Sequence, residues 1–225
     1  MWTPVWLSLQ VAGLATLIVA VLGMLTARWM QQTRLPFKEL LDSLFLLPMV
    51  LPPTITGFLL LWFLGKKGPV GEMLASFGIE IPFSFAGAVI AAAVVAFPLM
   101  YQSAGAGFAA VDRKLELASM SLGAGRIRTF VQVTLPLALP GFLSGIVLTF
   151  ARALGEFGAT LMLAGNIPGV TQTIPLAVFT AVEAGQMEEV TWFVGIMTVL
   201  SFVLVFLIKR WGRAQSAKQG GRLRA

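Results

Sequence analysis

Two opposite charges lie within an otherwise apolar stretch of the chain, Arg152 and Glu156. Their spacing of four residues would place both on one face of a helix, where an ion pair can form. Neither side chain can easily reach water from within a membrane span, so both should face protein or a water-filled path. Two interpretations follow: the pair lines or gates a path for anions, or it is a structural pair that fastens one helix to its neighbours.

The residue types that are absent limit the remaining chemistry. The sequence has no His and no Cys, which removes the commonest general base, the thiol nucleophile and most transition-metal ligands. It also lacks the Gly-x4-Gly-Lys-Ser/Thr loop that binds nucleotide phosphates. We therefore expect no catalytic residue, no metal site and no cofactor bound by this chain. A membrane-embedded enzyme is the weaker alternative.

The composition predicts a membrane protein that is entirely helical. Hydrophobic residues make up 57% of the chain and charged residues 12%, whereas a soluble domain carries about 25% charged residues. We expect one transmembrane domain over residues 1–225, because stretches of about 20 apolar residues can cross a bilayer as helices. The five predicted spans are approximately 5–29, 44–64, 85–107, 139–161 and 190–209.

A sixth crossing is not expected between residues 157 and 185. The run Gly165-Asn166-Ile167-Pro168-Gly169 has the composition of a polar turn. A short helix near Thr173 to Ala184 is predicted instead, at the outer interface or dipping into it.

Charge placement predicts the orientation. With five spans, nearly all Lys and Arg residues fall on one side, and that side should be cytoplasmic. The N-terminus is then outside, and a basic tail over 210–225 is inside. The formal net charge of +6 is explained by anchoring beside anionic lipid, so it is no evidence for nucleic acid. The basic residues assigned to the inner side are Arg28, Arg34, Lys38, Arg113, Lys114, Arg126, Arg128, Lys209, Arg210, Arg213, Lys218, Arg222 and Arg224.

Prolines interrupt the second predicted span. Pro48, Pro52 and Pro53 should bend the helix and free backbone carbonyls, which is tolerated where protein or a water-filled cavity satisfies them. This pattern is equally compatible with two interpretations: the prolines line a transport path, or they form a kink that improves packing. The candidate path residues are Pro52, Pro53, Thr54, Arg152, Glu156 and Thr160.

The loop over residues 111–135 is the most informative polar segment. Asp112 can cap a helix that continues to Leu122, and Gly123-Ala124-Gly125 can end it. A second helix is predicted from Arg126 to Val133, ended by Leu135-Pro136. Two short helices joined by a tight turn would either transmit a push from a partner or simply connect two spans.

This segment resembles the cytoplasmic signature of ABC-importer permeases, Glu-Ala-Ala-x3-Gly-x9-Ile-x-Leu-Pro. The matching residues are Glu116-Leu117-Ala118-Ser119, then Gly123, then Val133-Thr134-Leu135-Pro136, with Leu117 where the family has Glu. The resemblance implies coupling helices that dock on an ATP-hydrolysing subunit. The residues it assigns to coupling are Glu116, Ala118, Ser119, Gly123, Ala124, Gly125, Arg126, Leu135 and Pro136.

Further segments resemble the molybdate branch of these permeases, among them Leu47 to Thr54, Leu135 to Gly141, Phe150 to Thr160 and Gly165 to Gly169. The resemblance implies a permease in a prokaryotic cytoplasmic membrane that pairs with a second copy of itself. Its other partners would be two cytoplasmic subunits that bind ATP and Mg, and an extracytoplasmic oxyanion-binding protein. Tungstate and sulfate or thiosulfate importers are the alternatives. A stand-alone anion channel or secondary transporter is the rival class, and such proteins commonly show an inverted repeat, which we do not see here.

Overall fold

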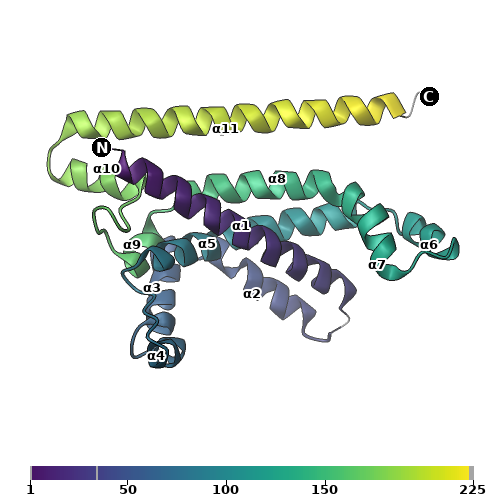
Figure 1. The fold of residues 1–225 in the computed structure, drawn as a ribbon, viewed down its shortest axis with the longest axis horizontal. Coiled ribbons are helices and arrows are strands. Elements are labelled where there is room, and N and C mark those ends of the chain that lie inside the picture. Colours follow the sequence, from purple (N-terminus) through teal and green to yellow (C-terminus); the bar gives the residue numbers. More distant parts are fainter. Residues whose placement is uncertain (1, 34, 223–225) are drawn as a thin grey trace.

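The computed structural model describes the backbone of residues 2–33 and 35–222 and the side chains of 2–33 and 35–206. Every regular element in this part of the chain is helical, as the composition predicted (Figure 1). The elements are α1 (Thr3–Gln32), α2 (Lys38–Val50), α3 (Pro53–Leu64), α4 (Pro69–Ser76), α5 (Phe85–Ala109), α6 (Arg113–Ser121), α7 (Arg126–Thr129), the π-helical turn η1 (Phe130–Thr134), α8 (Leu135–Leu154), α9 (Gly158–Ala164), α10 (Ile174–Glu183) and α11 (Met187–Arg222).

Helices α1, α5 and α8 form the centre of the molecule. They meet through small side chains, including Ala12, Ala88 and Ala92, all of which are fully buried. A Cβ added at Gly107 of α5 would lie 2.9 Å from the carbonyl oxygen of Ala138 on α8. Such close approach suits helices in lipid, where packing replaces the hydrophobic effect as the force between them.

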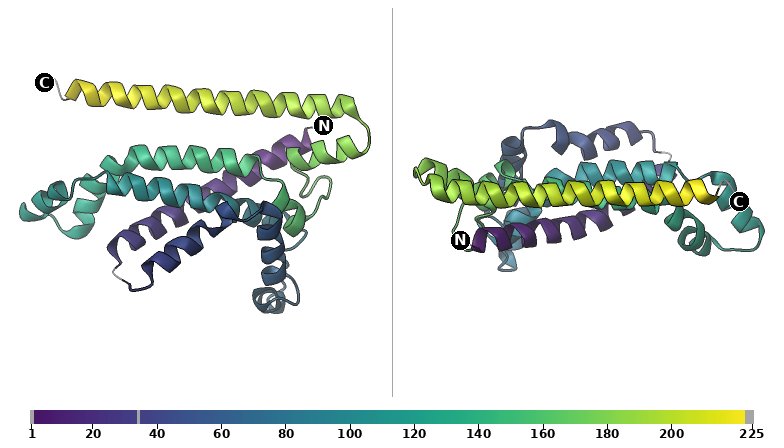
Figure 2. Two further views of the ribbon diagram at one scale, coloured as in Figure 1. Left: turned by 180° about the vertical axis from the view of Figure 1, so that it is seen from behind. Right: turned by 90° about the horizontal axis from the view of Figure 1, so that it is seen from above.

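Helix α11 lies beside this centre and is covered far less than the other long helices (Figures 1 and 2). In the most apolar 18-residue stretch of α11, only 6% is buried inside the protein, whereas the corresponding share for α5 is 56%. Met197 and Leu200 contact the buried centre, whereas Val199 and Phe202 are exposed. An exposed apolar face of this length is compatible with lipid or a further protein chain.

Four helical segments of the described chain are long and apolar enough to cross a membrane, and a bent pair could supply a fifth. Three are α1, α5 and the apolar part of α11, which contain or closely match the predicted spans 5–29, 85–107 and 190–209. The second predicted span, 44–64, is divided into α2 and α3, whose axes differ by 115°. Leu51 and Pro52 adopt extended backbone at this break, so the prolines bend the chain, as predicted.

The helix at the fourth predicted span, 139–161, begins and ends earlier than that prediction. Its helical, apolar segment runs from Arg126 to Leu154, instead of 139–161, and the predicted helix end at Leu135-Pro136 does not occur. The π-helical turn η1 joins α7 to α8. A π-helical turn changes the hydrogen-bond register, and Pro136 lies in the first turn of α8, where its missing N–H is tolerated.

The segment between α8 and α11 contains only short helices. Gly165 and Gly169 have positive φ angles of 70° and 79°, in the polar turn predicted there. Helix α10 agrees with the short helix expected near residues 173–184, and the backbone N–H of Ile174 donates to Ser8 Oγ on α1 at 2.7 Å.

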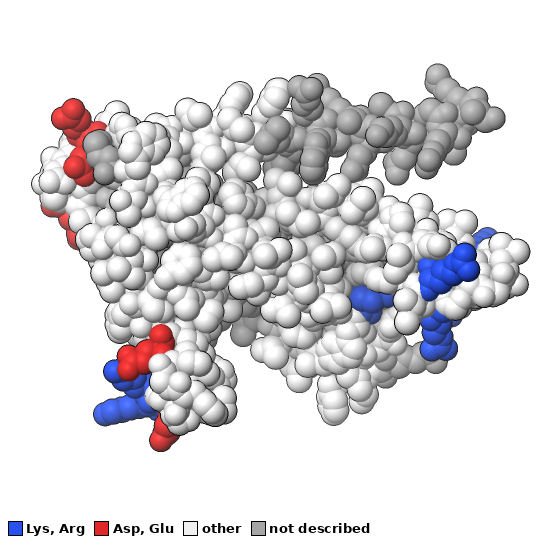
Figure 3. All heavy atoms as spheres, viewed as in Figure 1, with Lys and Arg blue, Asp and Glu red and all other residues white. Residues whose placement is uncertain are grey.

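Charged side chains gather at three places on the molecule (Figure 3). Lys and Arg predominate around α6 and α7, and the adjoining ends of α10 and α11 are acidic, with Glu183, Glu188 and Glu189. A mixed cluster beside α4 contains the ion pair of Lys66 with Glu80. The N-terminal end of α1 lies near the acidic end and the C-terminal end of α11 points toward the basic end (Figure 1). Arg34 and the side chains of the basic tail over 210–225 lie outside the described part.

Candidate functional site

Residues 113–134, here called the elbow, form the predicted helix, glycine turn and second helix. The carboxylate of Asp112 accepts a hydrogen bond from the N–H of Lys114 at 2.8 Å, which caps α6. Gly123 follows α6 with a φ angle of +89°, a conformation that favours glycine. The turn is closed by the N–H of Ala124, which donates to the Ser119 carbonyl at 3.2 Å.

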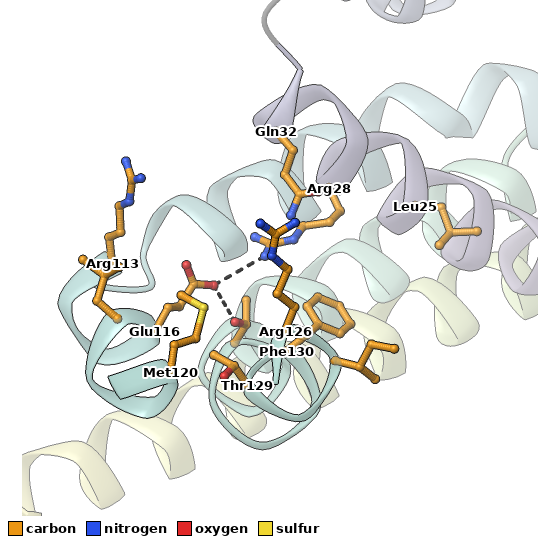
Figure 4. A pocket seen from close by; sticks show the side chains of 12 residues that line it. Leu25, Arg28, Gln32, Arg113, Glu116, Met120, Arg126, Thr129 and Phe130 are labelled. Carbon is orange, nitrogen blue, oxygen red and sulfur yellow. Dashed lines mark hydrogen bonds and ion pairs between the residues drawn. The ribbon is translucent and has the colours of Figure 1, made fainter. Parts of the chain in front are cut away.

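Glu116 faces the interior of the elbow and joins three elements (Figure 4). Its Oε1 lies 3.5 Å from Nη2 of Arg28 on α1 and accepts a hydrogen bond of 2.5 Å from Oγ1 of Thr134 in η1. About a fifth of the Glu116 side chain and a quarter of the Arg28 side chain are exposed. The carboxylate therefore braces α6 against α1 and η1.

Aromatic rings hold Arg28 in place. Its guanidinium carbon lies 5.4 Å from the ring centre of Phe108 on α5 and 5.3 Å from that of Phe130 in η1. These distances allow cation–π attraction. Phe108 in turn packs edge-on against Phe142 of α8, so the bracing contacts extend into the centre of the molecule.

A second contact links the two arms of the elbow. The hydroxyl oxygens of Ser119 on α6 and Thr129 on α7 lie 3.1 Å apart. Ser119 is half-buried and Thr129 is buried. The polar groups of the elbow thus turn inward and fix its angle.

Several large apolar side chains of the elbow are exposed. Leu122 is 89% exposed and Ile127 is 81% exposed, and Leu117 and Val131 are also exposed. Exposed charged side chains, among them Lys114 and Arg128, lie between these apolar ones. An exposed apolar patch on a polar end of a protein indicates an interaction surface.

The remaining residues assigned to coupling are divided by the structure. Ala118, Gly125 and Arg126 are exposed on the elbow, and Ala124 is half-buried in its turn. Leu135 and Pro136 lie in the first turn of α8, with Leu135 half-buried against the aromatic cluster of Phe108 and Phe142. They connect the elbow to the long helix and are not part of its outer surface.

The predicted ion pair of Arg152 and Glu156 is present, but Glu156 lies beyond the end of α8. Its Oε2 is 2.7 Å from Nη1 of Arg152, and its Oε1 accepts a hydrogen bond of 2.8 Å from the N–H of Ala159 in the first turn of α9. The Glu156 side chain is 2% exposed and that of Arg152 is 32% exposed. Glu156 therefore connects two helices while part of Arg152 stays accessible.

Helix α3 packs directly on α9 and brings the other candidate path residues near this pair. A Cβ added at Gly158 would lie 3.1 Å from Cβ of Pro53 and 3.2 Å from the backbone nitrogen of Thr54. Thr160 is buried on α9. Pro52 is exposed at the break between α2 and α3. The proline break, Thr54 and the Glu156–Thr160 segment are thus assembled at one place, away from the elbow.

Sequence reasoning missed the partners that hold the elbow. Arg28 and Glu116 are 88 residues apart, and no pattern in a single sequence links them. It also missed the hydrogen bond of 2.5 Å from Tyr101 Oη on α5 to Asp42 Oδ1 on α2. The sequence offered one indication that these residues have partners: Arg28 and Asp42 each lie at the end of an apolar run.

The fold is similar to that of solved ABC transporter chains. It matches a chain of the MetNI methionine ABC transporter in an inward-facing conformation, with a TM-score of 0.72 and 17% identity, covering 94% of each chain. It also matches a chain of an amino acid ABC transporter, with a TM-score of 0.63 and 21% identity, covering 92% of this chain and 90% of that one. The chain thus has the fold of these transporter chains.

Sequence comparison gives the family. The chain belongs to the family described as binding-protein-dependent transport system inner membrane component, whose match covers residues 13–215. It is 47% identical over 210 residues to the putative molybdenum transport system permease protein YvgM of Bacillus subtilis, covering 93% of this chain and 92% of the relative. It is 45% identical to the molybdenum transport system permease protein ModB of Escherichia coli K12, covering 98% and 97%. The expected inner-membrane location and the importer-permease class are confirmed.

Proposed function

We propose that this chain forms the translocation path of an ATP-driven molybdate importer and receives its driving force at the elbow. The single observation that carries the proposal is the braced elbow: part-buried polar contacts fix its shape, while Leu122 and Ile127 are exposed. A rigid element transmits displacement to the helices it contacts. Through η1 and Arg28, the elbow contacts both α8 and α1.

The charge distribution supports a cytoplasmic position for the elbow. Basic side chains predominate around it, and the adjoining ends of α10 and α11 are acidic (Figure 3), in agreement with the positive-inside rule. Lys66 and Lys67 lie elsewhere, and Lys66 is paired with Glu80. The proposed topology has five crossings, with α2 and α3 counted as one, the N-terminus outside and the C-terminus inside. Two ATPase subunits, which bind ATP and Mg, dock on the elbows of two copies of this chain.

Arg152 and the proline break supply the proposed path. The partly accessible guanidinium of Arg152 is oriented by the buried Glu156, and Thr54 at the start of α3 is exposed. A guanidinium and hydroxyl donors are suited to an oxyanion that passes without binding tightly. The substrate is proposed from the molybdenum transport relatives; tungstate and sulfate or thiosulfate are the alternatives. An extracytoplasmic binding protein delivers the anion.

Uptake into vesicles tests this function. The chain is purified with the subunits that accompany it and reconstituted, and uptake of radioactive molybdate is measured with and without ATP on the cytoplasmic side. We expect uptake only with ATP, strong competition by tungstate and weak competition by sulfate. In the same vesicles, Arg152→Ala should lower uptake about ten-fold or more without loss of assembly. ATP-independent uptake by the chain alone would instead support a channel or a secondary transporter.

A further inference from the structure

A basic pocket of about 750 Å³ lies between the end of α1 and the elbow (Figure 4). Its charged lining consists of Arg28, Arg113, Arg126 and a single acidic residue, Glu116. Glu116 is already paired with Arg28. Among the described side chains, neither Arg113 nor Arg126 takes part in an ion pair. The pocket therefore carries a net positive charge that the chain itself leaves uncompensated, which favours an anion.

The uncharged part of the pocket lining is largely apolar, with the polar side chains of Gln32, Thr129 and Thr134 beside it. Leu25, Met120, Ile127 and Phe130 line it together with the arginines. Apolar walls do not strengthen the binding of a small inorganic anion, because apolar surface contributes to binding only when another apolar surface removes it from water. The lining is suited to a ligand that is anionic at one end and apolar at the other.

An apolar stripe on α1 leads into the pocket. Ile18, Leu22, Leu25 and Trp29 are all exposed and are spaced at four, three and four residues, which places them along one face of the helix. Leu25 belongs both to this stripe and to the pocket. Since α1 is long and apolar enough to cross a membrane, this face is positioned to contact the acyl chains of lipid.

We propose that this pocket binds the phosphate headgroup of an anionic glycerophospholipid, whose acyl chains lie along the stripe of α1. Arg126, which extends from α7 toward the Glu116–Arg28 pair in Figure 4, receives the phosphate. Arg113, which extends away from that pair in the same view, adds positive charge to the lining. Basic pockets beside transmembrane helices on the cytoplasmic face commonly bind such headgroups. The lipid would then join the elbow to α1. The inference depends on the proposed function only in placing the elbow at the cytoplasmic surface.

Lipid retention measured by native mass spectrometry tests the inference. The full chain, with the subunits that accompany it, is titrated in detergent with phosphatidylglycerol and, separately, with phosphatidylcholine. We expect phosphatidylglycerol to bind preferentially, and Arg126→Gln to weaken its binding roughly five-fold. The matched control is Arg128→Gln, which removes the same charge from the same helix, because Arg128 does not line this pocket. The control should bind within two-fold of the unaltered chain.

Three outcomes would overturn the inference. Unchanged binding by Arg126→Gln would exclude the pocket as the site, and equal weakening by the control would indicate general surface attraction. Displacement of phosphatidylglycerol by millimolar glycerol 3-phosphate would assign the pocket to soluble phosphates. If Arg126→Gln fails to fold, Arg113→Gln replaces it with the same expectations. None of these readouts requires ATPase activity or transport, so failure here leaves the proposed function standing.

Discussion

Glu116 shows how one carboxylate can fix the position of a whole helix. It contacts Arg28 on α1 and Thr134 in η1, at 3.5 Å and 2.5 Å. The family signature has its Glu one position later, where this chain has Leu117. In the structure the carboxylate at 116 contacts two neighbouring elements, whereas Leu117 is about half exposed. We therefore assign Glu116 to bracing the elbow.

Replacing Glu116 should loosen the elbow without unfolding the protein. Glu116→Gln keeps the size of the side chain but removes the charge that Arg28 and Thr134 contact, at a cost of about 1–3 kcal/mol. Amide hydrogen exchange over residues 113–134 should then accelerate roughly ten-fold or more. Thr134→Val, which removes only one hydroxyl donor, should have a smaller effect. Exchange in α5 serves as the internal control, and an unaltered rate in the elbow would contradict the bracing role.

At the scale of elements, the elbow depends on its turn as well as on its ion pair. Gly123 has a φ angle of +89° and nothing within 4 Å of an added Cβ, while Gly125 also has open space around it but an ordinary φ angle of −67°. The two positions therefore differ mainly in backbone conformation. Side chains at positive φ cost about 1–2 kcal/mol.

Gly123→Ala should therefore uncouple transport, with Gly125→Ala as its matched control. We expect the first variant to import fewer anions per ATP hydrolysed, by several-fold, because a turn strained by Cβ relaxes to another angle. The second should behave like the unaltered chain, and both should insert and assemble normally. Equal coupling ratios in the two variants would show that the angle of the turn does not matter.

The elements also show where sequence reasoning succeeds and where it fails. Hydropathy located α1, α5 and α11, and local turn chemistry located Asp112, Gly123 and the short helix α10, because these features depend on neighbouring residues. Sequence reasoning did not predict the η1 turn that continues α7 into α8, nor the end of α8 at Leu154. Both depend on hydrogen-bond register and on packing between distant segments. The Arg28–Glu116 contact could not be predicted either, because it joins two segments that are distant in the sequence.

At the scale of the whole molecule, the two candidate sites lie at different places and share the same helices. The elbow is joined through η1 to α8, and the other end of α8 carries Arg152, which pairs with Glu156 before α9. Helix α3, after the proline break, packs on α9. A displacement of the elbow can thus reach the proposed path through one continuous helix, as the proposed coupling to ATP hydrolysis requires.

Site-directed crosslinking tests the central claim, that an ATPase subunit docks on the elbow at the cytoplasmic surface. The chain contains no Cys, so Leu122→Cys and Glu188→Cys each introduce a single reactive thiol, one on the elbow and one at the acidic end. We predict that Leu122→Cys crosslinks to an ATPase subunit and resists membrane-impermeant maleimide in intact cells, whereas Glu188→Cys is labelled in intact cells and captures no ATPase. Labelling of Leu122→Cys from outside, or its failure to capture an ATPase while transport is active, would contradict the account.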